Sequence, residues 1–288
     1  MKTIILISLL FITISLKSQP TNQPKYFSLG VCQKLENCQL VSKTTFEYIE
    51  CGVENLLAPT QSDETFQNNL QKIHTNNLTL YSCNNFIPAT LKSVGPDAVP
   101  DKIMAFAKVT FQRAKIAGIK IIVFGSGVSR KIPDGFDRQK ARDQFIDLLK
   151  HLAPLAQQYD IIIAIEPIRS QETNFINTVK EACEIARLVN HKNIRVLADF
   201  YHMACEGESP ESIVQAGNLL VHCHIAEKTN RAAPGVNKDD FTPYFKALHQ
   251  INYQGRISVE CSWTNFEKEA PEAISTLKKQ QDELSIKK

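Results

Sequence analysis

The chain has 288 residues, of which 43% are hydrophobic and 22% charged, and its formal net charge is +3. This length fits one α/β barrel or two ordinary domains, and the hydrophobic fraction is enough for a sizeable core. So small a net charge provides no electrostatic surface suited to nucleic acid or anionic lipid, so neither kind of partner is expected.

Residues 1–18 have the pattern of a secretory signal peptide. Lys2 supplies a charged start, residues 3–16 form an apolar run too short to span a bilayer comfortably, and Lys17 follows it. Removal of these two positive charges would lower the net charge to 3 − 2 = +1. We therefore expect export to a periplasm or to the medium, with no stable membrane insertion after cleavage. An uncleaved membrane anchor is the alternative.

Eight short apolar or β-branched runs recur along the rest of the chain, and polar turns and helical patterns separate them. Several runs are apolar at nearly every position, which is typical of parallel strands covered on both faces. Eight such units in series predict an α/β fold, a closed (β/α)₈ or TIM barrel, as a single domain over residues 25–288. The runs are 26–31, 48–51, 78–82, 120–124, 161–165, 194–198, 221–225 and 256–259.

The segments between the runs predict helices. Residues 102–117 and 137–159 repeat apolar residues at helical spacing, and two further helices are expected to start at Thr178 and Ser209, which suit N-caps. An open doubly wound sheet is the alternative fold. It would normally carry a glycine-rich phosphate turn after an early strand, and Gly-Ser-Gly at 125–127 stops short of that motif.

The eight cysteines do not have the spacing of a structural zinc site, because no C-x₂-C pair is present. Cysteines in barrel strands behave mostly as small buried hydrophobic residues. A local disulfide between Cys32 and Cys38 stays open, since export would permit one. Five cysteines fall in or next to predicted strands: Cys32, Cys51, Cys83, Cys223 and Cys261.

Each of the last four runs delivers a residue type that can bind a divalent metal: Glu166, Asp199, His224 and Glu260. In such a barrel the active site lies at the C-terminal ends of the strands, where these residues stand. Three carboxylates and one imidazole suit Mn²⁺, Mg²⁺, Co²⁺ or Zn²⁺, and a cation would relieve the repulsion among the carboxylates. His222 points the same way as His224, but the latter is nearer the mouth of the barrel and is preferred as the ligand.

Four stretches, in this order, carry a resemblance to a known family. They are Ile-Glu-Pro at 165–167, Ala-Asp-Phe-Tyr-His-Met at 198–203, His-Cys-His-Ile-Ala-Glu at 222–227 and Gly-Arg-Ile-Ser-Val-Glu-Cys at 255–261. Together they resemble the sugar phosphate isomerase/epimerase group with the xylose-isomerase-like barrel, which includes ketose 3-epimerases, hydroxypyruvate isomerase and inosose dehydratase. The resemblance covers residues 26–263.

The resemblance implies one divalent cation held by Glu166, Asp199, His224 and Glu260, with Glu166 and Glu260 also forming the acid/base pair. The substrate would be a ketose or related keto-sugar. The cation would polarise its carbonyl, one glutamate would remove the adjacent proton to give a metal-bound enediolate, and the other would return a proton from the opposite face. This predicts an isomerase or epimerase. A homo-oligomer is compatible with it.

Three further positions match substrate-binding residues of the family. Glu172 lies six residues after Glu166, and His202 lies three after Asp199. Arg231 resembles a substrate-binding arginine, although it lies one residue farther along the chain than in the epimerases.

Three other activities are weighed against epimerisation. A lyase or dehydratase, inosose dehydratase-like or keto-glycoside-eliminating, would use the same residues and expel a β-substituent. A DNA-repair endonuclease of the endonuclease IV type would need extra histidines after the second and third strands, where this chain has Glu-Cys-Gly at 50–52 and Tyr-Ser-Cys-Asn at 81–84. A non-catalytic sugar-binding barrel is disfavoured because all four ligand positions are filled.

Several other polar residues follow the second, third and fourth predicted strands, and Trp263 follows the last. Trp263 is expected either to form a wall for a sugar ring or to pack in the core. The polar residues are expected to line a pocket or to serve as turn residues. They are Glu54, Asn55, Asn84, Asn85 and Arg130.

Overall fold

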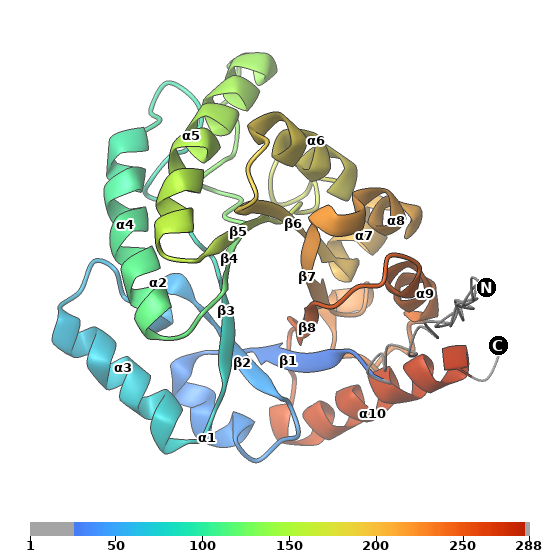
Figure 1. The fold of residues 1–288 in the computed structure, drawn as a ribbon. Helices are drawn as coiled ribbons and strands as arrows, with labels where there is room; N and C mark the ends of the chain where they lie inside the picture. The colour runs from blue at the N-terminus through green and yellow to red at the C-terminus, as the bar shows by residue number, and fades with distance from the viewer. Residues whose placement is uncertain (1–25, 286–288) are drawn as a thin grey trace, which may run out of the picture.

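A computed structural model describes residues 26–285, which form a closed parallel barrel inside a ring of helices (Figure 1). The strand order follows the chain, and β8 pairs back onto β1 to close the barrel. The prediction of a (β/α)₈ barrel is therefore confirmed. The expected signal peptide at residues 1–18 lies outside the described residues.

Each strand overlaps the apolar run that predicted it. The largest displacement is in β3, which begins two residues later than its run and continues through Ser82 and Cys83 to Asn84. These buried residues extend the ladder because Cys83 and Asn84 pair with the end of β2. The strands are β1 (Ser28–Cys32), β2 (Tyr48–Gly52), β3 (Leu80–Asn84), β4 (Ile121–Phe124), β5 (Ile162–Ile165), β6 (Ile194–Asp199), β7 (Leu220–Ile225) and β8 (Arg256–Val259).

The helices begin where side-chain caps or prolines allow. Thr178 caps α6 by accepting from the main-chain N–H of Glu181, as expected. α8 begins at Glu211 with Pro210 at the N-cap position, later than expected, but the Ser209 hydroxyl still accepts the main-chain N–H of Glu211 at 3.2 Å. The helices are α1 (Cys38–Val41), α2 (Val53–Leu56), α3 (Asp63–Thr75), α4 (Pro100–Ile116), α5 (Arg138–Gln158), α6 (Val179–Val189), α7 (Phe200–Glu206), α8 (Glu211–Ala216), α9 (Thr242–Gln250) and α10 (Phe266–Ser285).

The lower part of the barrel interior is closed by stacked aromatic and cationic side chains. The guanidinium of Arg256 lies 4.1 Å from the ring centre of Tyr81 and 5.2 Å from that of Tyr48. Gly30 of β1 faces the Tyr48 ring so closely that a Cβ at this position would overlap it. Tyr48 also lies two residues before Glu50 on β2, so both side chains point to the same face of the strand. The carboxylate of Glu50 therefore lies directly above this aromatic layer.

All eight cysteines are free thiols, so the disulfide left open between Cys32 and Cys38 is not formed. Cys51, Cys83 and Cys223 are buried in strands, as expected, whereas Cys32 is partly exposed. Burial raises the pKa of the Cys223 thiol to about 12, which keeps it protonated and unreactive.

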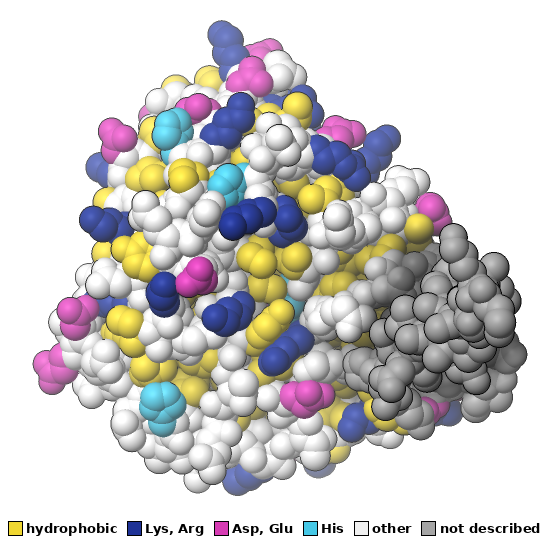
Figure 2. Space-filling model, viewed as in Figure 1, with side chains coloured by type: hydrophobic (Ala, Val, Ile, Leu, Met, Phe, Trp, Pro, Cys, Tyr) yellow, Lys and Arg dark blue, Asp and Glu magenta, His cyan; other side chains and the backbone are white. Residues whose placement is uncertain are grey.

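The surface carries charges of both signs. On the face drawn in Figure 2, Lys and Arg side chains lie among Asp and Glu side chains and uncharged surface. Within residues 26–285, the helices lack the combination of length and apolarity needed to cross a bilayer.

Candidate metal centre and active site

Four side chains from consecutive strands meet at the C-terminal end of the barrel. Glu166 follows β5, Asp199 ends β6, His224 lies in β7 and Glu260 follows β8. Each offers a ligand atom within 4.8 Å of those of the others. Nδ1 of His224 is 3.0 Å from Oε1 of Glu166 and 3.1 Å from Oε2 of Glu260. The structure therefore brings together the four predicted ligands, with His224 rather than His222 in the cluster.

This donor set fits a divalent cation. Three carboxylates converge in a largely buried place, which is costly unless positive charge offsets their repulsion. In the protein alone that charge comes from two side chains. Burial by itself would raise the pKa of Glu260, but His224 and Arg231 lower it to about 2. Three carboxylate oxygens and one imidazole nitrogen match the preferences of Mn²⁺, Mg²⁺, Co²⁺ or Zn²⁺.

A further carboxylate, Glu50 of β2, holds both histidines of β7. It is fully buried, and its Oε2 lies 2.8 Å from Nε2 of His222 while its Oε1 lies 3.1 Å from Nε2 of His224. The hydroxyls of Ser82 and Ser258 also donate to it, at 2.7 and 2.6 Å. Burial alone would raise the pKa of Glu50, but the two imidazoles hold it well below its ordinary value.

The contact with Glu50 determines which nitrogen of His224 faces the cluster. Because Nε2 is directed at Glu50, Nδ1 is the atom available to a metal beside Glu166 and Glu260. A carboxylate behind a ligating histidine orients the ring and raises its basicity. Sequence reasoning missed Glu50, although it too is an acidic residue near the C-terminal end of an apolar run. His222 lies one pleat deeper than His224, on the same carboxylate.

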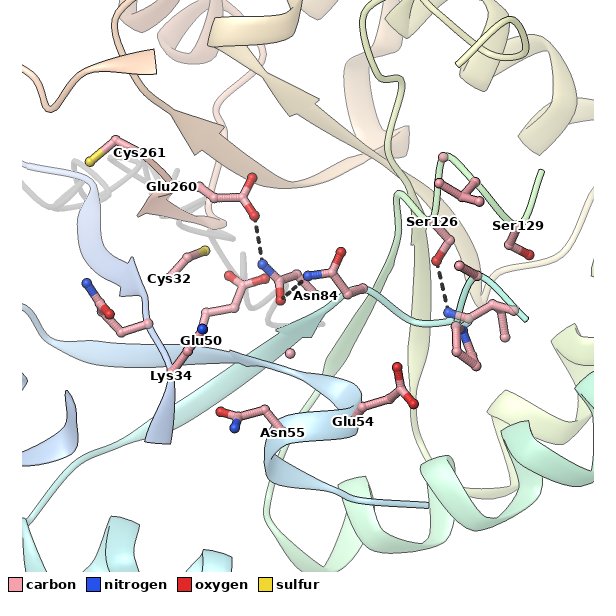
Figure 3. A pocket seen from close by; sticks show the side chains of 18 of the residues that line it. Cys32, Lys34, Glu50, Glu54, Asn55, Asn84, Ser126, Ser129, Glu260 and Cys261 are labelled. Atoms are coloured by element: carbon pink, nitrogen blue, oxygen red, sulfur yellow. Dashed lines mark hydrogen bonds between the residues drawn. The ribbon is translucent and has the colours of Figure 1, made fainter. Parts of the chain in front are cut away.

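The two glutamates of the expected acid/base pair are held from neighbouring strands. Nδ2 of Asn84, at the end of β3, donates to Oε1 of Glu260 at 2.7 Å (Figure 3). Glu166 lies against Gly125, and a Cβ at Gly125 would overlap Oε2 of Glu166. Asn84 therefore lines the site, as expected, and Gly125 leaves the space that the Glu166 carboxylate occupies.

Of the two roles left open for Arg130, pocket lining and loop structure, the structure supports the second. Its side chain is fully buried behind Glu166 and does not line the cavities at the C-terminal end of the barrel that are described below. Its guanidinium donates to the main-chain oxygens of Glu166 at 2.7 Å and Phe124 at 2.8 Å, and Nε donates to that of Phe175 at 3.2 Å. Arg130 thus ties the ends of β4 and β5 to the loop after β5 and fixes the main chain of Glu166.

We expect Gly125→Ala to reduce turnover about 100-fold while the protein still folds, since the added methyl displaces the mobile end of the Glu166 side chain rather than main chain. The measurement is steady-state kinetics together with thermal unfolding. Gly127→Ala is the matched control, because its Cβ would lie 3.5 Å from Ile168 and Thr173, an ordinary contact distance. Equal losses in the two variants would contradict the role of Gly125.

The three residues expected to bind substrate also reach this place. Glu172, His202 and Arg231 line a cavity of about 160 Å³ together with Glu166 and Glu260. Within it, Nη2 of Arg231 lies 2.5 Å from Oε2 of Glu260. The cavity is therefore lined by both candidate proton-transfer groups and by donors for sugar oxygens.

Arg231 reaches the site although it lies one residue farther along the chain than the matching arginine of the epimerases. Asn230 and Arg231 both have left-handed backbone conformations, with φ of 59° and 51°. The buried carboxylate of Glu227 organises the following loop by accepting main-chain N–H groups, including those of Gly235 at 2.7 Å and Asp239 at 3.3 Å. Burial alone would lower the pKa of Arg231, but Glu260 and Asp199 raise it.

The closed parallel eight-stranded barrel, with a carboxylate-rich cluster at the C-terminal ends of its strands, defines the protein as a TIM barrel with its candidate site in the position usual for that class. The model of one family of that class, the xylose isomerase-like TIM barrel, matches residues 38–280. The chain belongs to this family, which confirms the resemblance seen in the sequence.

Individual relatives include sugar epimerases. A D-psicose 3-epimerase of Enterocloster bolteae is 29% identical over 175 residues, which span 59% of this chain and 57% of that protein. An L-ribulose 3-epimerase of Methylomonas sp. is 28% identical over 76% of this chain and 75% of its own length. A crystal structure of 3-keto-D-glucoside 4-epimerase from E. coli shares the fold, with a TM-score of 0.73, 18% identity and coverage of 88% of this chain and 99% of that one.

Proposed function

We propose that the protein is a divalent-metal-dependent sugar epimerase or isomerase that acts on a ketose or related keto-sugar. The main support is the meeting of two glutamates, Glu166 and Glu260, in one ligand cluster beside a small cavity. Its walls also carry a guanidinium and an imidazole that can donate to sugar oxygens. Family membership and the epimerases among its relatives agree with this activity.

The residues divide the reaction between them. A bound divalent cation would supply the positive charge that acidifies the C–H next to the substrate carbonyl. Glu166 and Glu260 act as the two bases: one removes that proton, and the other delivers a proton to the opposite face of the same carbon. Two bases are needed because a single base would return the proton to the face it left. Asn84 and Arg231 hold the Glu260 carboxylate in place.

The decisive experiment is incubation of metal-loaded protein with a panel of ketoses and 3-keto-glycosides in D₂O, followed by NMR. Deuterium at the carbon next to the carbonyl is expected, together with inversion at that carbon. Loss of water or of an aglycone without inversion would assign the alternative lyase activity, which uses the same residues. An absence of both exchange and elimination across the panel would contradict the proposal.

Metal removal is expected to destabilise the protein. A cation that binds only the folded state adds about 2.7 kcal/mol to the free energy of unfolding when its concentration is 100 times Kd. Dialysis against a chelator should therefore lower Tm, and Mn²⁺, Mg²⁺, Co²⁺ or Zn²⁺ should restore it. Elemental analysis should find one ion per chain. Unchanged Tm after complete removal of metal would argue against the site.

We also infer that the mature protein is exported after cleavage near residue 18. Its support is the charged start and short apolar run of residues 1–17. N-terminal sequencing of the native protein tests it, and an intact Met1 would contradict cleavage.

A further inference from the structure

A second, wider cavity opens beside the small one. It has a volume of about 630 Å³ and is lined by the segments that follow β1, β2, β3, β4 and β8 (Figure 3). The two cavities adjoin each other, because five residues line both: Asn85, Ser126, Gly127, Val128 and Glu260.

The expected proton-transfer groups lie at one end of this combined space. Glu260 lines both cavities, whereas Glu166 lines only the small one. A carbon that exchanges a proton with both glutamates must therefore lie in or beside the small cavity. At about 160 Å³ that cavity is below the usual range for ligand pockets, about 300–1,000 Å³, whereas the wide cavity is within it. The wide cavity extends away from the reacting carbon, and its volume is larger than a single sugar unit requires.

The wall of the wide cavity combines polar groups with an aromatic side chain. Lys34 and Glu54 have no side-chain partner within residues 26–285, and both are exposed to the cavity solvent. Asn55 adds an amide, and Figure 3 shows all three on the same side of the cavity. Trp263 lines the wall and also packs against the hydrophobic core, and Phe266 lies against its ring, with ring centres 4.9 Å apart at 80°.

We propose that the wide cavity is a second saccharide subsite, so that the substrate is a glycoside with its keto unit in the small cavity and its second ring against Trp263. Hydroxyl groups match the free donors and acceptors, and the apolar face of a pyranose matches an indole ring. This inference rests on the proposed function and narrows its substrate from keto-sugars in general to glycosides of keto-sugars.

The charges of the wall favour an uncharged second ring. The positive charge of Lys34 and the negative charge of Glu54 sum to zero. The other carboxylates, Glu50 and Glu260, are already paired with histidine or arginine. The wall therefore lacks the cluster of basic groups that a phosphate would need.

Binding can be measured apart from turnover, because Trp263 is the only tryptophan of the chain. Intrinsic fluorescence thus reports directly on this cavity. We expect at least one of cellobiose, maltose, trehalose and sucrose to change the fluorescence of metal-loaded protein with an apparent Kd at least tenfold below that of glucose. If glucose binds as tightly as all four disaccharides, the second subsite is contradicted.

Kinetics with matched substrates give the second test. The substrates are 3-keto-glucose and the 3-keto derivative of the disaccharide that binds most tightly. Trp263→Ala should lower about tenfold the ratio of kcat/KM for the disaccharide derivative to kcat/KM for 3-keto-glucose. Trp263→Phe keeps an aromatic wall and should restore most of the ratio, and it also serves if the alanine variant fails to fold. Leu188→Ala, at a half-exposed position of α6 outside both cavities, is the control.

The two proposals can fail separately. Tight disaccharide binding with no exchange or turnover of either keto compound would overturn the proposed function and leave the subsite intact. Turnover of both compounds with a ratio that Trp263→Ala does not change would overturn the subsite and leave the function intact.

Discussion

Replacement of either Glu166 or Glu260 by glutamine is expected to abolish measurable epimerisation, with kcat lowered by at least about 10²–10⁴-fold. Glutamine keeps the size of the side chain and one oxygen ligand, but it cannot accept or deliver the proton. Each variant lacks one of the two bases, so inversion should stop in both. The measurement is the rate of inversion by NMR, with the metal content of each variant determined alongside.

Glu172→Gln provides the matched control for these variants. Glu172 lines the same cavity, but its carboxylate is paired with Arg169 at 2.6 Å and lies outside the ligand cluster. Its loss should act mainly through KM. Full activity in either Glu166→Gln or Glu260→Gln, with metal bound, would rule out the two-base mechanism.

Substitution of Glu50 should have the second largest effect, and on two different quantities. Glu50→Gln removes the charge behind His224 and should weaken metal binding about 10–100-fold. Glu50→Ala also removes the carboxylate that faces Nε2 of both buried imidazoles and should lower the free energy of unfolding by about 3–5 kcal/mol. Metal affinity is measured by competition with a chromophoric chelator, and stability by denaturant unfolding.

Ser82→Ala separates the role of the carboxylate from that of its surroundings. It removes one hydroxyl donor at 2.7 Å from Oε2 of Glu50, but Ser258 and His222 remain on the same oxygen. The expected cost is about 1 kcal/mol of stability, with metal affinity close to that of the wild type. Wild-type metal affinity in Glu50→Gln would show that the charge of Glu50 does not contribute to metal binding.

The barrel and its ligand cluster could be predicted because both follow from local patterns. A strand buried on both faces must be apolar throughout, so a Glu, Asp or His at its end stands out. Glu166, Asp199 and Glu260 were found in this way. Glu50 was not, because its importance comes from His222, which lies 172 residues away in the chain and meets it only across the closed barrel.

Other features depend on main-chain geometry that the sequence does not display. The sequence left open whether Arg130 lines a pocket or serves in a loop, because its partners are main-chain carbonyls, which every residue possesses. Arg231 stood one residue out of place, and the left-handed pair that it forms with Asn230 was not visible from spacing alone. Ser209 accepts from the first residue of α8 as a capping side chain would, but the insertion of Pro210 moves the start of the helix to Glu211.

The uninterrupted strand order of the barrel also divides labour between the two halves of the chain. All four candidate ligands come from β5 to β8, whereas most of the wide cavity is built from segments that follow β1 to β4. Most insertions or substitutions in the first half can therefore change the substrate specificity without disturbing the ligand cluster that carries the reaction. The exceptions are four residues that contact ligand residues of the second half: Glu50, Asn84, Gly125 and Arg130. Exchange of first-half loops between relatives is a direct route to new specificities, provided that these four residues are retained.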